Sequence, residues 1–175
     1  MRQQITEGQL GALYEMDFLT VFGHWENFIE DCTVRMLAGQ GCPSYVPTIA
    51  APPKSPSLTA ARTRLLNGRR FLLWYDPKVA ADRIAGHVTG SPLELALRGA
   101  ETGIGQMAGV RHAIAHQPQD ALASFSTVSA EMVGVVHSSP GDLLRSLDHS
   151  DPLNPRRWLR RLTSDLRILG IQATA

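Results

Sequence analysis

The first long segment of the chain has a helical pattern of hydrophobic and polar positions. Hydrophobic side chains recur at steps of three and four residues from Ile5 to about Leu37, the spacing that places them on one face of an α-helix. Gly39, Gly41 and Pro43 follow directly, and glycine and proline commonly mark helix ends. The pattern therefore predicts one long amphipathic helix that ends near Leu37.

Prolines dominate the next segment. Five of them occur between Pro43 and Ser57, and each lacks a backbone N–H donor and restricts its own backbone angle. Regular structure is therefore not expected, and the sequence predicts an extended loop over residues 43–57. A loop longer than about a dozen residues is unusual inside a compact domain, which favours a functional role or mobility.

Small polar residues mark the starts of the next helices. Asp76 and Ser91 each precede a proline, and Ser57 or Thr59 begins a run of helix-forming residues. Such side chains cap helix starts, and proline is favoured at the first helical position. These signals predict helices over residues 58–66, from 77 to about 87, and from 92 to 116.

Glycines interrupt the predicted 92–116 helix. Gly99, Gly103, Gly105 and Gly109 each cost about 1 kcal/mol relative to alanine inside a helix. They indicate a kink, or close packing against another helix of the chain or of a second copy. Pro118 is expected to end this helix.

Two more helices are predicted near the C-terminus. Asp120 is expected to cap a helix that runs to about Val136, and Pro140 with Gly141 is expected to turn the chain. An arginine-rich amphipathic helix follows over residues 155–169.

Strand patterns are nearly absent, because only Phe71 to Tyr75 resembles a short strand. The 175 residues, 43% of them hydrophobic, suffice for one domain with a sizeable core and are too few for two ordinary domains. We therefore predict an all-α fold. It is a single domain over residues 1–175, a bundle of about five to six helices with a long proline-rich loop.

Charge and cysteine content narrow the class of protein. The formal net charge is +1, so any electrostatic footprint for nucleic acid must be local. The cysteines are Cys32 and Cys42, and the chain starts without the charged and apolar regions of a secretion signal. No apolar run approaches the roughly 18 to 20 residues that cross a bilayer. We expect a cytoplasmic protein that does not enter a membrane.

A local concentration of positive charge comprises Arg62, Arg64, Arg69 and Arg70, with no acidic residue close in sequence. Such a cluster can bind the phosphates of RNA. It can equally be a solvated surface, and both interpretations stay open. A second basic cluster near the C-terminus comprises Arg156, Arg157, Arg160, Arg161 and Arg167.

The segment VRHAIAHQPQDA, residues 110–121, places Arg111, His112 and His116 on one helical stretch. His112 and His116 share a helix face, a spacing that can bring two imidazoles onto one metal ion. However, alanine follows His112 where a zinc protease has glutamate, and no nearby acid or cysteine completes a ligand set. We predict no metal site and no cofactor. The plainest alternative is a solvated helix end, with His116 stabilised by the helix dipole.

The same segment resembles the sequence mark of the HEPN superfamily of small all-α proteins, an arginine followed a few residues later by a histidine. Arg111 matches the arginine, His112 the polar residue that often follows it, and His116 the histidine. Further similarities to the branch described as RiboL-PSP-HEPN or MAE-like are Ala121, Phe125, the pair Trp25 and Glu26, and the PGDLLRSL segment from Pro140 to Leu147.

The resemblance implies a metal-independent endoribonuclease, a toxin or defence effector. Its partners would be an RNA substrate, a second copy of the chain in a homodimer, and a cognate antitoxin. Such cleavage needs a base for the 2′-hydroxyl, an acid for the leaving 5′-oxygen and a fixed cation on the phosphate. Arg111 would hold the phosphate, His116 would be the principal acid and base, and His112 would orient the phosphate or share proton transfer. The products would be a 2′,3′-cyclic phosphate and a 5′-hydroxyl.

Helix geometry constrains this site. Arg111 and His116 lie about 140° apart around a straight helix, so both reach one phosphate only if the helix end is distorted or a dimer supplies the second motif. Glu26 is either a supporting residue that pairs with an active-site arginine or an ordinary surface acid. The alternative function is a non-catalytic HEPN-like module that binds a partner protein or a nucleotide.

Overall fold

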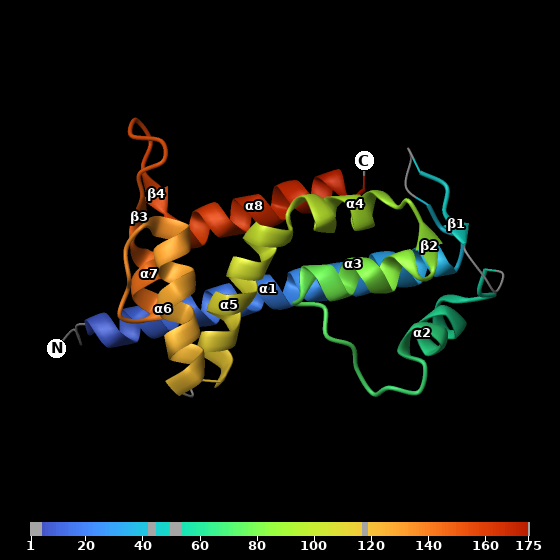
Figure 1. Cartoon of the computed structure of the whole chain (residues 1–175), viewed down its shortest axis with the longest axis horizontal. Helices are drawn as coiled ribbons and strands as arrows, with labels where there is room; N and C mark the ends of the chain where they lie inside the picture. Colours follow the sequence, from blue (N-terminus) through green and yellow to red (C-terminus); the bar gives the residue numbers. More distant parts are fainter. Residues whose placement is uncertain (1–4, 42–44, 50–53, 117–118, 175) are drawn as a thin grey trace. The chain divides into compact units, whose positions relative to one another are not determined.

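The computed structural model describes residues 5–41, 45–49, 54–116 and 119–174, which form eight helices and four two-residue strands (Figure 1). The predicted all-α class is confirmed, with more helices than expected. The helices are α1 (Glu7–Leu37), α2 (Leu58–Leu66), α3 (Pro77–Ala85), α4 (Pro92–Gly99), α5 (Glu101–His116), α6 (Gln119–Val133), α7 (Pro140–Arg145) and α8 (Trp158–Gln172). The strands are β1 (Thr48–Ile49), β2 (Val88–Thr89), β3 (Leu147–Asp148) and β4 (Arg156–Arg157). None of the described helices is both long and apolar enough to span a membrane.

Three helix starts lie where the sequence predicts them. The side-chain oxygens of Ser57, Asp76 and Ser91 accept hydrogen bonds from the backbone N–H three residues further on, at 3.1, 2.9 and 3.0 Å. Each bond satisfies an N–H group that has no partner within its own helix. The first helix ends at Leu37, also as predicted.

The single helix predicted over residues 92–116 is wrong, because α4 and α5 are separate helices. Ala100 lies between them with φ −109° and ψ 16°, which departs from α-helical backbone angles. Gly99, which directly precedes Ala100, is one of the glycines that indicate a kink, and the structure has a full break between two helices there. Pro118, expected to end the helix, lies outside the described residues, and α5 extends to His116.

Elements after α5 also differ from the prediction. The segment expected to turn at Pro140 and Gly141 is a short helix, α7, because the Ser139 side chain caps it and proline is well suited to its first turn. The helix α6 begins at Gln119, before the Asp120 predicted as its cap, and ends at Val133. The helix α8 begins at Trp158 because residues 156–157 form strand β4.

The four strands lie outside residues 71–75, the segment whose hydrophobic pattern resembles a strand. Residues 71–74 belong to no strand, and Phe71 is 69% exposed while Trp74 is 3% exposed. Instead β1, inside the proline-rich segment, pairs antiparallel with β2, and β3 pairs antiparallel with β4. The expectation of no regular structure over residues 43–57 is therefore wrong at Thr48–Ile49. Whether a strand forms depends on a partner strand that is distant in the sequence. The number of prolines in the segment gives no information about that partner.

Backbone contacts divide the chain into two compact units. Unit 1 comprises Met1–Gly23 and Gln106–Leu166, and unit 2 comprises His24–Gly105 and Arg167–Ala175. The helices α1, α5 and α8 each contribute residues to both units. Each unit has its own set of buried side chains.

The core of unit 1 is rich in phenylalanine. Phe18, Phe22 and Phe125 are almost fully buried, and the ring centroids of Phe18 and Phe22 lie 5.9 Å apart. Burial of such a side chain stabilises the fold by about 1.5–3 kcal/mol. At Gly109 the helices α5 and α6 approach closely, because a Cβ atom there would lie 2.8 Å from a methyl group of Val128. Packing within the chain thus accounts for this glycine.

In unit 2 the helix α3 packs against α4. Ile84 of α3 and Leu93 and Leu97 of α4 are buried in this unit. The Nε1–H group of Trp74 donates a hydrogen bond to Glu30 of α1 at 2.9 Å. This bond satisfies the one polar atom of a buried indole and ties the segment before α3 to α1.

Candidate functional site

The candidate catalytic residues occupy the last turns of α5, in unit 1. The ring centroids of His112 and His116 lie 4.7 Å apart, with an angle of 55° between the ring planes. Both histidines are exposed, whereas Arg111 is half-buried. The structure thus brings the two imidazoles together at the surface, as their spacing of four residues predicts.

The sequence of α5 explains which way these side chains face. Val110 and Ala113 are 0% and 1% exposed, so this side of the helix faces the core of unit 1. His112 and His116 are exposed, and Arg111 lies at the boundary between the two environments. Two adjacent exposed imidazoles can carry one proton between them, so one can accept a proton while the other donates one.

The helix is α-helical through His116. A distorted end between Arg111 and His116, one of the two expected ways to bring them onto one phosphate, is therefore not found before residue 117. Arg111 also makes a contact of its own within the chain. The other expected solution, a shared cleft in a dimer, stays a prediction.

Two further expectations concern Glu26 and metal ions. Glu26 lies on the part of α1 that belongs to unit 2, is half-buried and has an interaction within the chain. Its predicted pairing with an active-site arginine stays a prediction.

Among the described residues, no three or more His, Cys, Asp or Glu side chains gather as a metal site would require.

The four predicted RNA-binding arginines have different surroundings in unit 2. Arg62 forms ion pairs with Glu30 and Asp31 of α1, both at 3.1 Å. Its position is thus explained by contacts that hold α2 against α1. Arg70 is exposed. Arg64 and Arg69 line a pocket of about 400 Å³.

Two residues that the sequence did not single out complete this pocket. Arg83, in the last turn of α3, and His87, just after that helix, line it together with Arg64 and Arg69. Burial lowers the pKa of the Arg83 guanidinium, and the positive charge of Arg69 lowers it further. The pKa of His87 is also lowered, by burial first and then by Arg64 and Arg83. The cations are therefore close enough to repel one another.

A signal for Arg83 and His87 was present in the sequence. They are four residues apart at the end of a predicted helix, where they lie near one another. Their proximity to Arg64 and Arg69 was not predictable, because it depends on the path of the chain between α2 and α3.

In the second basic cluster, Arg161 is engaged with acids. Arg161 bonds Asp148 at 3.1 Å and Asp165 at 2.9 Å. Burial alone would raise the pKa of Asp148, but hydrogen bonds from Ser150 and Arg161 lower it overall.

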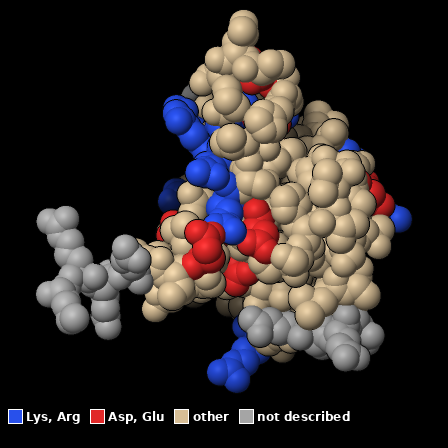
Figure 2. Space-filling view, turned by 90° about the vertical axis from the view of Figure 1, so that its left-hand side faces the viewer, with Lys and Arg blue, Asp and Glu red and all other residues tan. Residues whose placement is uncertain are grey.

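Figure 2 shows Lys and Arg side chains directly beside Asp and Glu side chains near the middle of the face in view. That face therefore presents mixed charge, not a broad basic surface for nucleic acid.

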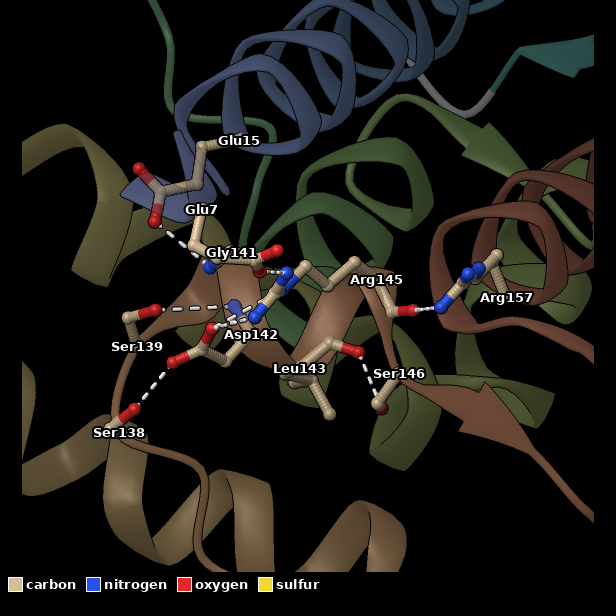
Figure 3. Close-up of polar contacts among 10 residues, drawn as sticks. All are labelled: Glu7, Glu15, Ser138, Ser139, Gly141, Asp142, Leu143, Arg145, Ser146 and Arg157. Atoms are coloured by element: carbon tan, nitrogen blue, oxygen red, sulfur yellow. Dashed lines mark hydrogen bonds and ion pairs between the residues drawn. The ribbon is translucent and has the colours of Figure 1, made fainter. Parts of the chain in front are cut away.

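A network of polar contacts holds α7 against the start of α1 in unit 1 (Figure 3). The Arg145 side chain bonds Asp142 at 3.2 Å and also bonds Glu7. The backbone N–H of Gly141 donates to Glu15 at 2.9 Å. These contacts satisfy the charged groups of α7 internally, so we assign this network to the stability of unit 1.

Comparisons with known proteins add no assignment. No family model, curated protein or solved structure matches the chain.

Proposed function

We propose that the chain is a metal-independent endoribonuclease of HEPN type whose catalytic residues are Arg111, His112 and His116. The observation that carries this proposal is the pair of exposed imidazoles 4.7 Å apart at the end of α5. Both rings are accessible to a strand of RNA, and histidine is the side chain best suited to proton transfer near neutral pH.

The proposed reaction needs two proton transfers. The 2′-oxygen attacks the phosphorus, and its proton passes to the imidazole of His116. The bond between phosphorus and the 5′-oxygen breaks, and the leaving oxygen takes a proton from the imidazolium of His112. The products are a 2′,3′-cyclic phosphate and a 5′-hydroxyl, and each proton transfer contributes about 10²–10⁴-fold to the rate.

Arg111 supplies the fixed cation of the proposal. Its guanidinium can bind two phosphate oxygens through parallel hydrogen bonds and stabilise the charge that develops on them. On a regular helix Arg111 and His116 face about 140° apart, and α5 stays helical through both. We therefore include a homodimer in the proposal, in which the Arg111 of one copy serves the histidines of the other.

The cellular role rests on the resemblance of the Arg111 to His116 segment alone. On that basis the protein acts in the cytoplasm as a toxin or defence effector, with an antitoxin as its partner. A non-catalytic module is the second candidate. It is favoured by the contact that Arg111 already makes within the chain, since an engaged arginine is less available to a substrate.

The test compares two histidine variants. His116→Ala should abolish cleavage of single-stranded RNA and leave the helical circular dichroism spectrum unchanged, because His116 is exposed. His149→Ala is the matched control, since His149 is also exposed and lies in the same unit. Equal activity of the two variants would reject the proposal in favour of the non-catalytic module.

A further inference from the structure

The basic pocket of unit 2 is built by two helices and a tight turn. Arg64 comes from the last turn of α2. Asn67 and Gly68 then adopt left-handed backbone conformations, with φ of 44° and 77°, and glycine or asparagine is favoured in this region. The turn brings Arg69 to the same pocket, where Arg83 and His87 face it from the end of α3.

Arg83 is held in place by contacts outside the cavity. Its Nη1 group donates to the backbone carbonyl of Leu73 at 3.0 Å. Its guanidinium carbon lies 5.0 Å from the ring centroid of Trp74, within the range of a cation–π interaction. Since Trp74 is itself fixed by its bond to Glu30, the cation is positioned before any ligand arrives.

The residues that line the pocket bring several basic side chains together. Among the described residues that line it there is no Asp or Glu. Arg64 also has an interaction of its own within the chain. Cations in a half-buried site repel one another, and an anion between them relieves that repulsion.

We propose that this pocket binds the phosphate of a phosphate monoester through Arg64, Arg69, Arg83 and His87. A monoester carries close to two negative charges at neutral pH and offers three acceptor oxygens, which matches several donors from different directions. The volume of about 400 Å³ lies within the range of small-ligand sites. Leu65 and Leu72 also line the pocket and can contact the organic group of the ester.

Two sources share this chemistry: a small phosphorylated molecule and the 5′-terminal phosphate of an RNA strand. The site lies in unit 2 and needs no proton transfer by His112 or His116. The proposal therefore goes beyond the ribonuclease activity and does not depend on it.

The primary test is calorimetric titration with phenyl phosphate. We expect binding by the full chain, and binding about tenfold weaker or more for Arg69→Gln, because a charge-assisted bond to phosphate is lost. Arg167→Gln is the matched control, an exposed arginine of the same unit outside the pocket, and should bind as the original chain does. Absence of binding, or an equal loss in both variants, would overturn the proposal.

A second measurement reports on the pocket itself. Addition of phenyl phosphate should move the NMR signal of the His87 imidazole toward its protonated position, because the bound dianion offsets the repulsion from Arg64 and Arg83. An unchanged His87 signal at saturating phenyl phosphate would place the ligand elsewhere and overturn the assignment.

The two sources are separated with short RNA strands of one sequence that carry either a 5′-phosphate or a 5′-hydroxyl. They are titrated into the His116→Ala chain, which is expected not to cleave them. The binding result therefore holds even if the ribonuclease proposal fails. Tighter binding of the phosphorylated strand, lost in Arg69→Gln, supports the proposal with RNA ends as the ligand. Equal binding of both strands, with phenyl phosphate still bound through Arg69, supports it with a small phosphorylated molecule as the ligand.

Discussion

The imidazole rings of His112 and His116 lie 4.7 Å apart on the exposed side of α5. A pair in which one ring is protonated and the other neutral is the form that can both donate and accept a proton. The pH dependence of RNA cleavage therefore tests whether both rings take part in proton transfer.

We predict a bell-shaped dependence of kcat/KM on pH for RNA cleavage. The rate should fall at low pH as the base becomes protonated and at high pH as the acid loses its proton. Replacement of His112 by alanine should remove the fall at high pH and lower the maximal rate by about 10²–10⁴-fold. A bell of unchanged shape in His112→Ala would show that His112 takes no part in proton transfer.

Gly141 gives a direct test of the packing of α7 on α1. A Cβ atom at this position would lie 2.8 Å from both the Cα and the carbonyl oxygen of Gly11, and backbone cannot move aside as a flexible side chain can. Gly141→Ala should therefore lower the free energy of unfolding by about 1–3 kcal/mol, measured by urea denaturation.

The control for that substitution is Gly103→Ala. A Cβ atom at Gly103 would meet nothing within 4 Å among the described residues, and alanine favours helix over glycine by about 1 kcal/mol. This variant should be as stable as the original chain or more stable. If the Gly141→Ala variant were as stable as the Gly103→Ala variant, that result would contradict the close approach of α7 to α1.

His87 should make stability depend on pH. Its pKa in the folded chain lies below the ordinary value of 6.5 because of burial, Arg64 and Arg83. Between the folded and unfolded pKa values the unfolded chain binds more protons, so the free energy of unfolding falls as pH drops through about 6.5. Well above that pH, His87 is neutral in both states and has no such effect.

We predict that urea denaturation at pH 7.5 and 5.5 will show a smaller loss of stability in His87→Gln than in the original chain. The substitution removes the titrating group and keeps a polar side chain in the pocket. His149→Gln, at an exposed histidine, should retain the original pH dependence. Equal losses in the original chain and in His87→Gln would show that the surroundings of His87 do not oppose its protonation.

Much of the secondary structure was predictable because local signals determine it. The caps at Ser57, Asp76 and Ser91 act within one helical turn, and the end of α1 at Leu37 precedes a glycine. The glycines indicated a kink in the 92–116 segment, but four of them carry the same local signal, so the sequence did not show that the helix breaks at Gly99 and Ala100.

The candidate sites show the same limit. The adjacency of His112 and His116 follows from helical spacing, so the sequence alone predicted it. The pocket of Arg64, Arg69, Arg83 and His87 requires the end of α2, the segment that follows it and the end of α3 to meet around one cavity. Such contacts between distant segments are not encoded in the spacing of any one motif.

The dimeric cleft predicts complementation between inactive chains. If the arginine of one copy serves the histidines of the other, a mixture of Arg111→Ala and His116→Ala chains should regain part of the cleavage activity. Mixed dimers then contain one site with both groups intact. Each variant alone should stay inactive. A fully active monomer by light scattering at micromolar concentration would contradict the shared cleft.

The central claim is that Arg111, His112 and His116 cleave RNA without a metal ion. The most direct measurement is mass spectrometry of a single-stranded oligoribonucleotide after incubation with the protein in EDTA. We expect fragments with a 2′,3′-cyclic phosphate at one end and a 5′-hydroxyl at the other, absent with His116→Ala and present with His149→Ala. Intact RNA in EDTA, with cleavage only after a divalent cation is added, would contradict it.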